Sequence, residues 1–277
     1  MNIIDRGDGA PLVFIPGIQG RWEWMEPAVA ALARRCRVIT FSLADEPTCG
    51  GRFDEATGFW CYVEQVREAM DAAGLARATI CGVSYGGLVA AAFAARHPER
   101  VASLVLVSAI PPAWTPNARV RFFLRAPRLL SPLFMVASLR MYREIAAATG
   151  GLIPGATVGL RQAVRVLTHM FSPGRMSRRV HLLEGVTLEP ELRRVHVPTL
   201  VMTGDGTLDA VVPIQETQRY ATIWPHARLV TIERTGHLGS ITRADEFARL
   251  VMRFLDEAVG REGQVGRVGP EERRHVG

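Results

Sequence analysis

The possible folds of this chain are constrained most by one short stretch, CGVSYGGL, at residues 81–88. It holds a single serine, Ser84, among small residues. A β-branched, apolar run precedes it at residues 78–81, and an alanine-rich helical pattern follows at residues 88–96. A serine at a sharp corner between a strand and a helix needs small neighbours, because the backbone there is crowded and strained. Two interpretations are open: a reactive serine held at a corner, or a glycine-rich turn that happens to contain a serine.

The surrounding chain alternates between strand and helix patterns. Apolar runs predict strands at residues 12–15, 37–41 and 101–107. Helical spacing predicts helices at residues 22–33 and 57–73. The run at residues 101–107 is apolar almost without a break, which is typical of a strand buried on both faces. Strands of this kind alternating with helices predict a mostly parallel sheet covered on both sides.

The alternation stops at Pro111-Pro112, and strand patterns return only at residues 198–204 and 228–232. The intervening segment has helical patterns, such as those at residues 120–130 and 159–170, but no convincing strand. The glycine-rich, charged C-terminal tail is typical of disorder. The predicted organisation is an α/β core at residues 1–109 and 196–260, a helical insertion at residues 110–195, and a disordered tail at residues 261–277.

Charge is concentrated in the predicted helical insertion. The chain has a net charge of +6 and no lysine, so all 33 basic residues are arginines. Between Ile110 and Val195 thirteen arginines face four glutamates, a local charge of +9. Basic stretches occur in nucleic-acid-binding proteins, but these arginines alternate with apolar residues at helical spacing. We therefore expect them on solvent-exposed helix faces, and we expect no nucleic-acid partner.

Several classes of protein are disfavoured by the sequence. No apolar stretch reaches the length of a membrane span, and the N-terminal residues lack the features of a signal peptide. The four cysteines and seven histidines show no spacing typical of a metal site or a disulfide framework. The sequence thus predicts a cytoplasmic protein without stable membrane insertion and without a metal, and it indicates no oligomeric state.

A reactive serine needs a base, and the base needs an acid that orients it. In an α/β sheet these partners lie in loops that follow the carboxyl ends of strands. Asp205 and Asp209 follow the strand predicted at residues 198–204, and His237 follows the next predicted strand. We therefore expect Ser84, one of the two aspartates and His237 to meet at one edge of the sheet.

Taken together, these motifs resemble those of the α/β-hydrolase superfamily, within it the esterase-like branch with a helical cap. The resemblance covers roughly residues 8–258 and rests on GVSYGG at 82–87, LDAVVP at 208–213 and GH at 236–237. It implies an α/β-hydrolase fold, a mostly parallel sheet flanked by helices. The helical insertion matches in position and helical character, which implies a cap over Ser84.

The resemblance implies a catalytic triad. Ser84 is the expected nucleophile, His237 the expected general base and Asp209 the expected acid. Asp209 stands four residues before Pro213, as the family pattern asks. Asp205 stays open as an alternative acid, because the loop before Pro213 is longer than usual.

The resemblance also implies an oxyanion hole made of two backbone N–H groups, those of Ile18 and Tyr85. Pro16-Gly17 stands where the family usually has His-Gly. The donor at Ile18 is a main-chain group and survives that difference, but the shape of the loop and the class of substrate depend on it.

The implied activity is that of a serine hydrolase that cleaves a carboxylic ester through an acyl-enzyme and needs no cofactor. A helical cap over an apolar pocket favours a small-molecule substrate with a hydrophobic acyl or aryl group. The same residues suit a lactone, an amide or a carbon–carbon bond. A small-molecule receptor that has kept the fold is a further alternative, because a fold does not determine its function.

Overall fold

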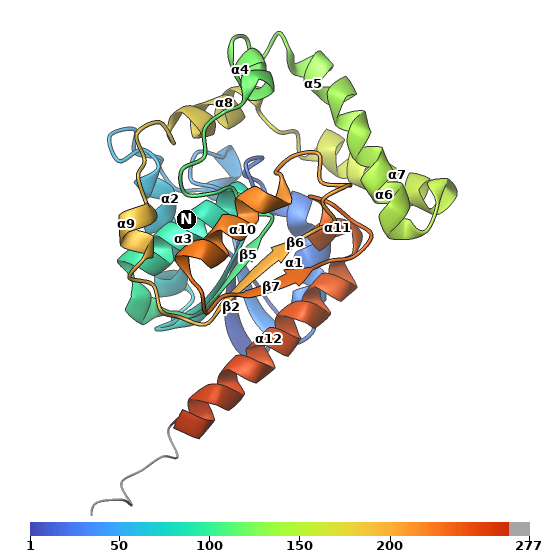
Figure 1. Cartoon of the computed structure of the whole chain (residues 1–277). Helices are drawn as coiled ribbons and strands as arrows, with labels where there is room; N and C mark the ends of the chain where they lie inside the picture. Colours follow the sequence, from blue (N-terminus) through green and yellow to red (C-terminus); the bar gives the residue numbers. More distant parts are fainter. Residues whose placement is uncertain (266–277) are drawn as a thin grey trace, which may run out of the picture.

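A mixed seven-stranded sheet forms the centre of the computed structural model, which describes residues 1–265 (Figure 1). The strands are β1 (Ile4–Arg6), β2 (Ala10–Ile15), β3 (Cys36–Thr40), β4 (Ala78–Val83), β5 (Val101–Val107), β6 (Thr199–Thr203) and β7 (Arg228–Thr231). Their spatial order is β1-β3-β2-β4-β5-β6-β7. Every neighbouring pair is parallel except β1 and β3, so the expected mostly parallel sheet is confirmed.

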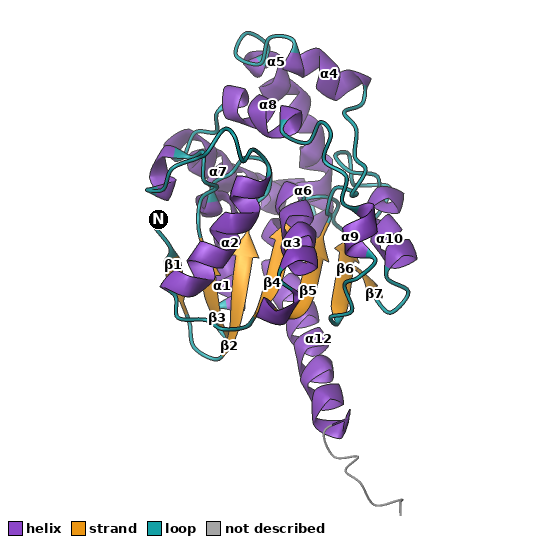
Figure 2. Ribbon diagram, turned by 90° about the vertical axis from the view of Figure 1, so that its left-hand side faces the viewer, coloured by secondary structure: helices purple, strands orange, loops and turns teal. Residues whose placement is uncertain are grey.

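Helices cover both faces of the sheet (Figure 2). The main covering helices are α1 (Glu26–Leu32), α2 (Trp60–Ala72), α3 (Tyr85–Arg96), α10 (Ile214–Ile223), α11 (Gly239–Thr242) and α12 (Ala244–Val265). Short 3-10 turns lie at Trp22–Met25, Pro47–Cys49 and Pro98–Arg100. Helices α2, α3 and α10 pack on one face, and α1 and α12 pack on the other.

The central strands are buried on both faces, which explains their almost unbroken apolar sequences. In β5, Leu104 and Leu106 point into the core on the α3 side, whereas Val105 and Val107 point into the core on the α12 side. Successive residues of a strand face opposite sides, so each side chain needs an apolar partner in one layer or the other. The observed strand β5 therefore covers the same residues, 101–107, as the apolar run that predicted it.

The residues between β5 and β6 form helices, and no strand occurs there in the described chain. These helices are α4 (Ala118–Leu124), α5 (Ser131–Ser138), the 3-10 turn Leu139–Met141, α6 (Tyr142–Thr149), α7 (Leu152–Thr168), α8 (Pro173–His181) and α9 (Glu189–Leu192). Figure 2 shows the arrowheads of the parallel strands pointing towards α4, α5 and α8. The helical insertion thus lies over the carboxyl edge of the sheet.

The structure differs from the sequence-based expectations at several elements. The edge strand β1 and helix α10 were not predicted. The helix expected at residues 120–130 corresponds to α4, which ends several residues earlier, at Leu124. The helix expected at residues 159–170 corresponds to α7, which begins several residues earlier, at Leu152. Helix α12 continues to Val265, so the first five residues of the predicted disordered tail are helical. The rest of that tail lies outside the described residues. No helix within residues 1–265 combines the length and apolar character needed to cross a bilayer.

Candidate active site

Ser84 stands alone between a strand and a helix. Strand β4 ends at Val83 and helix α3 begins at Tyr85, so Ser84 must make the whole turn. Its φ of 54° and ψ of −116° lie in a region that side-chain-bearing residues rarely adopt. A backbone conformation of this kind costs about 1–3 kcal/mol and persists only where the surroundings enforce it.

Hydrogen bonds and a close backbone approach enforce this conformation. The Ser84 N–H donates to the carbonyl of Val107 at 2.9 Å, and its carbonyl accepts from the N–H of Gly87 at 3.0 Å. A methyl group added to Gly82 would lie 2.1 Å from the Gly86 carbonyl oxygen, far inside van der Waals contact. The small residues around Ser84 are therefore required by the tight corner, as the sequence indicated.

Asp209 and His237 come together from two neighbouring loops, one after β6 and one after β7. His237 Nδ1 lies 3.4 Å from Asp209 Oδ2, and the two side chains are only 10% and 2% exposed. This separation is longer than a well-formed hydrogen bond, and Nδ1 has no aligned partner in the described part of the chain. A methyl group on Gly236 would lie 2.6 Å from the Asp209 nitrogen, so only glycine permits the two loops to approach this closely.

Asp209 is held as a carboxylate despite its burial. Burial acts to raise its pKa, but the contact with His237 and the charge of that ring act in the opposite direction. Its Oδ1 also accepts hydrogen bonds from the N–H groups of Val211 and Val212, at 2.9 and 3.0 Å. The net result is a pKa below the usual value for an aspartate, so Asp209 is charged at neutral pH.

Asp205, the alternative acid, is turned towards its own loop. Its Oδ1 accepts hydrogen bonds from the N–H and the hydroxyl of Thr207, at 2.8 and 2.7 Å. These hydrogen bonds lower its pKa, and the side chain faces solvent. Of the two aspartates that the sequence left open, the structure brings Asp209 to His237.

Ser84 lies at the same edge of the sheet as these two loops, because β4, β6 and β7 run parallel. Among the described residues, no hydrogen bond joins Ser84 Oγ to His237. Contacts between a serine and its base are often loose in a protein without substrate and tighten in the complex.

Two backbone N–H groups beside Ser84 are free to bind an anion. Tyr85 is the first residue of α3, so its N–H has no acceptor inside the helix. The N–H of Ile18 has no protein acceptor within the described chain. The turn that carries Ile18 is close to the serine, since a methyl group on Gly17 would lie 3.6 Å from Ser84 Cβ. The turn that carries Ile18 and the first residue of α3 therefore both lie next to Ser84.

Arg179 on α8 links the helical insertion to this turn. Its Nη1 donates to the carbonyl of Ile18 at 2.6 Å, while Nη2 donates at 2.6 Å to each of Asp45 Oδ1 and Glu46 Oε1. All three charged side chains are fully buried. Burial acts to lower the pKa of Arg179, but the two carboxylates outweigh it and hold the pKa above the usual value.

The sequence-based expectation that the insertion arginines lie on solvent-exposed helix faces is wrong for Arg179. Helical spacing does not predict the burial of Arg179. Its neighbour Arg178 is exposed although the two residues are adjacent in the sequence. The signal available in the sequence was the adjacent acidic pair Asp45-Glu46 after β3. It identifies no partner without the three-dimensional structure.

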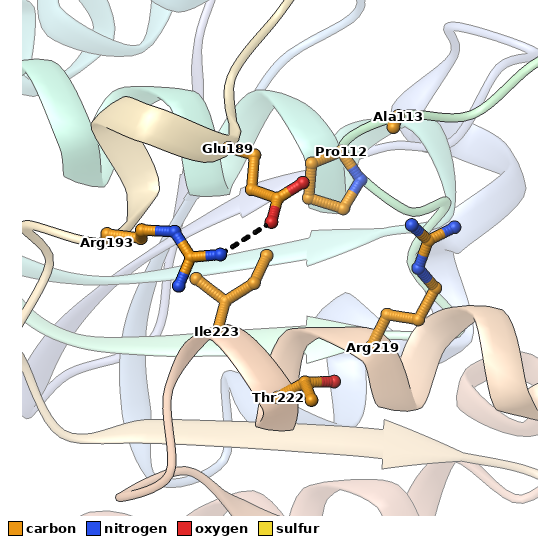
Figure 3. Close-up of a pocket in the computed structure, with 7 residues that line it drawn as sticks. All are labelled: Pro112, Ala113, Glu189, Arg193, Arg219, Thr222 and Ile223. Atoms are coloured by element: carbon orange, nitrogen blue, oxygen red, sulfur yellow. Dashed lines mark hydrogen bonds and ion pairs between the residues drawn. The ribbon is translucent and has the colours of Figure 1, made fainter.

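A separate cavity of about 240 Å³ lies beside α9 and α10 (Figure 3). An ion pair between Glu189 and Arg193, at 2.9 Å, forms part of its wall. The lining residues are Pro112, Ala113, Glu189, Arg193, Arg219, Thr222 and Ile223. None of the expected site residues belongs to this lining, so we assign the candidate active site to Ser84 and its neighbours instead.

No group of three or more His, Cys, Asp or Glu side chains within residues 1–265 is arranged to hold a metal ion. The side chains that gather at the carboxyl edge of the sheet are instead a serine, a histidine and a carboxylate beside two free N–H groups. Side chains of these types are the ones that acyl transfer by a serine nucleophile requires.

Comparison with known proteins identifies the family. The sequence profile of the alpha/beta hydrolase fold family matches residues 10–244 of the chain. The chain belongs to this family.

Individual relatives are similar over most of their length. One is a 2-hydroxymuconate semialdehyde hydrolase from Pseudomonas putida, 29% identical over 272 residues, which are 93% of this chain and 91% of the relative. Another is a poly(3-hydroxyalkanoate) depolymerase from Ectopseudomonas oleovorans, 29% identical over 259 residues, which are 89% of this chain and 84% of the relative. The crystal structure of an enol-lactonase from Burkholderia xenovorans matches with a TM-score of 0.72 and 22% identity, covering 92% of this chain and 96% of that one. At this level of identity, the similarity to the enol-lactonase structure shows a shared fold and nothing more.

Replacing Arg179 tests the link between α8 and the turn. Arg179→Met keeps much of the side-chain volume but leaves Asp45 and Glu46 buried without their partner. We expect the free energy of unfolding to fall by about 3–5 kcal/mol, measured by urea denaturation.

The matched control is Arg178→Met, since Arg178 forms a partly exposed ion pair with Glu55. A pair of this kind contributes at most about 1 kcal/mol. Equal small effects of the two substitutions would show that the buried network does not hold the insertion in place.

Proposed function

We propose that the chain is a serine hydrolase that cleaves a carboxylic ester, with Ser84 as nucleophile, His237 as general base and Asp209 as the acid. The observation that carries this proposal is the buried contact between His237 and a charged Asp209 at the same sheet edge as Ser84. A neutral serine hydroxyl becomes an effective nucleophile only beside such a base.

The reaction proceeds in two stages. Ser84 Oγ attacks the ester carbonyl while His237 accepts the hydroxyl proton, and the alcohol leaves with that proton, which gives an acyl-enzyme. A water molecule then loses a proton to His237 and attacks the acyl group, and the acid is released as Ser84 is restored. In both stages the N–H groups of Ile18 and Tyr85 stabilise the oxyanion, each by a few kcal/mol (about 3–4 by analogy with removed donors).

The proposed substrate carries a hydrophobic acyl or aryl group beneath the helical insertion, which acts as a cap. Aromatic rings of the insertion contact one another and reach the core: Phe123 touches Phe134, and Phe171 touches both Phe134 and Trp24. An ester is favoured by the similarity to a poly(3-hydroxyalkanoate) depolymerase, because a poly(3-hydroxyalkanoate) contains ester linkages.

A second candidate reaction is cleavage of a carbon–carbon bond next to a carbonyl group, by the same side chains. The observation that favours it is the similarity to a 2-hydroxymuconate semialdehyde hydrolase. The two reactions differ in the group that leaves, so turnover of simple esters separates them.

Covalent labelling tests the nucleophile. A fluorophosphonate should add a single adduct to the wild-type protein, located on Ser84 by intact mass and peptide mapping, because Ser84 Oγ displaces fluoride as it would an alcohol. Ser84→Ala should remove the adduct and the esterase activity. A folded wild-type protein that takes up no label would argue for a receptor rather than an enzyme.

Substitution of each aspartate tests the acid. Asp209→Asn should lower kcat by about 10⁴-fold, because the imidazole loses both its orientation and the partner of its positive charge. Asp205→Asn is the matched control and should change kcat by less than about threefold, since the side chain of Asp205 is hydrogen-bonded to Thr207 and not to His237 in the described part of the chain. The reverse ranking, in steady-state assays with a p-nitrophenyl ester, would assign the acid to Asp205.

A chain-length series tests the apolar cap. Each methylene buried in the pocket contributes up to about 0.8 kcal/mol, so kcat/KM for p-nitrophenyl esters should rise up to about fourfold per CH₂ until the pocket is full. The dependence on salt should be weak for these neutral substrates. A large, salt-sensitive preference for carboxylate-bearing esters would instead indicate that the arginines of the insertion attract an anionic substrate.

A further inference from the structure

Glu144, on α6 of the helical insertion, is a buried carboxylate that the proposed reaction does not use. Glu144 is only 1% exposed. Its Oε1 accepts hydrogen bonds from the hydroxyl of Thr235, at 2.9 Å, and from the N–H of Leu238. Thr235 and Leu238 stand on either side of His237 in the chain. One oxygen atom of the insertion therefore joins the two ends of the segment that carries His237.

The segment around His237 is thus held from two sides. On the core side, the N–H of Asp205 donates to the Thr235 carbonyl at 2.6 Å, and Asp209 contacts the imidazole. On the insertion side, Glu144 receives the hydroxyl of Thr235 and the N–H of Leu238. The strand that leads into this segment, β7, is at the edge of the sheet and is only partly buried, so the sheet alone constrains the segment weakly.

The carboxylate of Glu144 is unfavourable for the stability of the fold. Its Oε2 is buried without a hydrogen-bond partner in the described part of the chain. Burial raises the pKa of Glu144 above its usual value, although the donors from Leu238 and Thr235 and the charge of His237 act in the opposite direction. Burial of a charged group with an unsatisfied oxygen costs free energy. The position of Glu144 is therefore better explained by an effect on His237 than by a contribution to stability.

We propose that Glu144 is a positioning residue for His237, which makes the helical insertion part of the catalytic apparatus as well as a cap. The proposal rests on the proposed function, because it assigns His237 the role of base. Glu144 acts through its Oε1 as a hydrogen-bond acceptor that fixes the segment from Thr235 to Leu238. A displacement of a catalytic group by about 1 Å lowers a rate by about 100-fold, so the expected effect is on the chemical step.

The test measures inactivation by a fluorophosphonate, with the rate constant kinact and the binding constant KI determined separately. Glu144→Asp keeps the negative charge but withdraws the carboxylate from Thr235 and Leu238. We expect it to lower kinact by about 10- to 100-fold while KI changes by less than about twofold. Glu144→Gln keeps an acceptor oxygen in place, and its kinact should stay within about threefold of the wild type.

Two further variants serve as controls. Glu184→Ala removes another acidic side chain of the insertion, one that is exposed and pairs with His181, and it should leave kinact unchanged. Thr235→Val removes one of the two donors to Glu144 and should lower kinact by about three- to tenfold relative to the wild type at an unchanged KI, and wild-type kinact in this variant would overturn the proposal. This second variant keeps the test decisive if Glu144→Asp does not fold, which thermal unfolding of each variant reports.

Each result decides the proposal. Wild-type kinact in folded Glu144→Asp would overturn it, as would an effect on KI rather than kinact, or an equal loss in Glu144→Asp and Glu144→Gln. A large fall in Tm for Glu144→Asp at unchanged kinact would show a purely structural residue. Failure of the proposed function gives a different result, since the wild-type protein itself would then not be labelled.

Discussion

The geometry of the candidate active site depends on one backbone constraint: a single residue, Ser84, connects the end of β4 to the start of α3. Helix α3 packs back against β4 across this one residue. Ser84 takes up the whole turn with a positive φ, and Gly82 must lack a side chain because the Gly86 carbonyl lies against it. The same corner leaves the N–H of Tyr85 without a helical acceptor next to the serine. The strain at Ser84 and the free donor beside it therefore have one cause.

The helical insertion is bound to the core by buried charges on two sides of Ser84. Arg179 joins α8 to the turn that carries Ile18, and Glu144 joins α6 to the segment that carries His237. Each group costs free energy to bury. Arg179 is paired with Asp45 and Glu46, but each of these two carboxylates, like that of Glu144, has one oxygen without a hydrogen-bond partner in the described part of the chain. Displacing α8 would leave Arg179 or its two carboxylates buried without a partner, so these ion pairs favour one arrangement of α8 on the core.

The sequence predicted the features that local chemistry controls. The bounds of β5 follow from its apolar run, and the corner at Ser84 follows from its glycines. The spacing to Pro213 favoured Asp209 over Asp205, but the contact of Asp209 with His237 depends on how two loops approach each other across Gly236, which the sequence does not show. The burial of Arg179 was likewise hidden, since its partners lie more than 130 residues away in the chain. Long-range pairing of charged groups leaves little trace in the pattern of a single sequence.

The most direct measurement is a crystal structure of the protein after inhibition by a fluorophosphonate, whose tetrahedral phosphorus mimics the intermediate of ester cleavage. The account predicts phosphorus bonded to Ser84 Oγ. It also predicts a phosphoryl oxygen about 2.7–3.1 Å from the backbone nitrogens of Ile18 and Tyr85, with His237 Nε2 facing Ser84 Oγ. An adduct on another residue, or a phosphoryl oxygen directed away from both N–H groups, would contradict it.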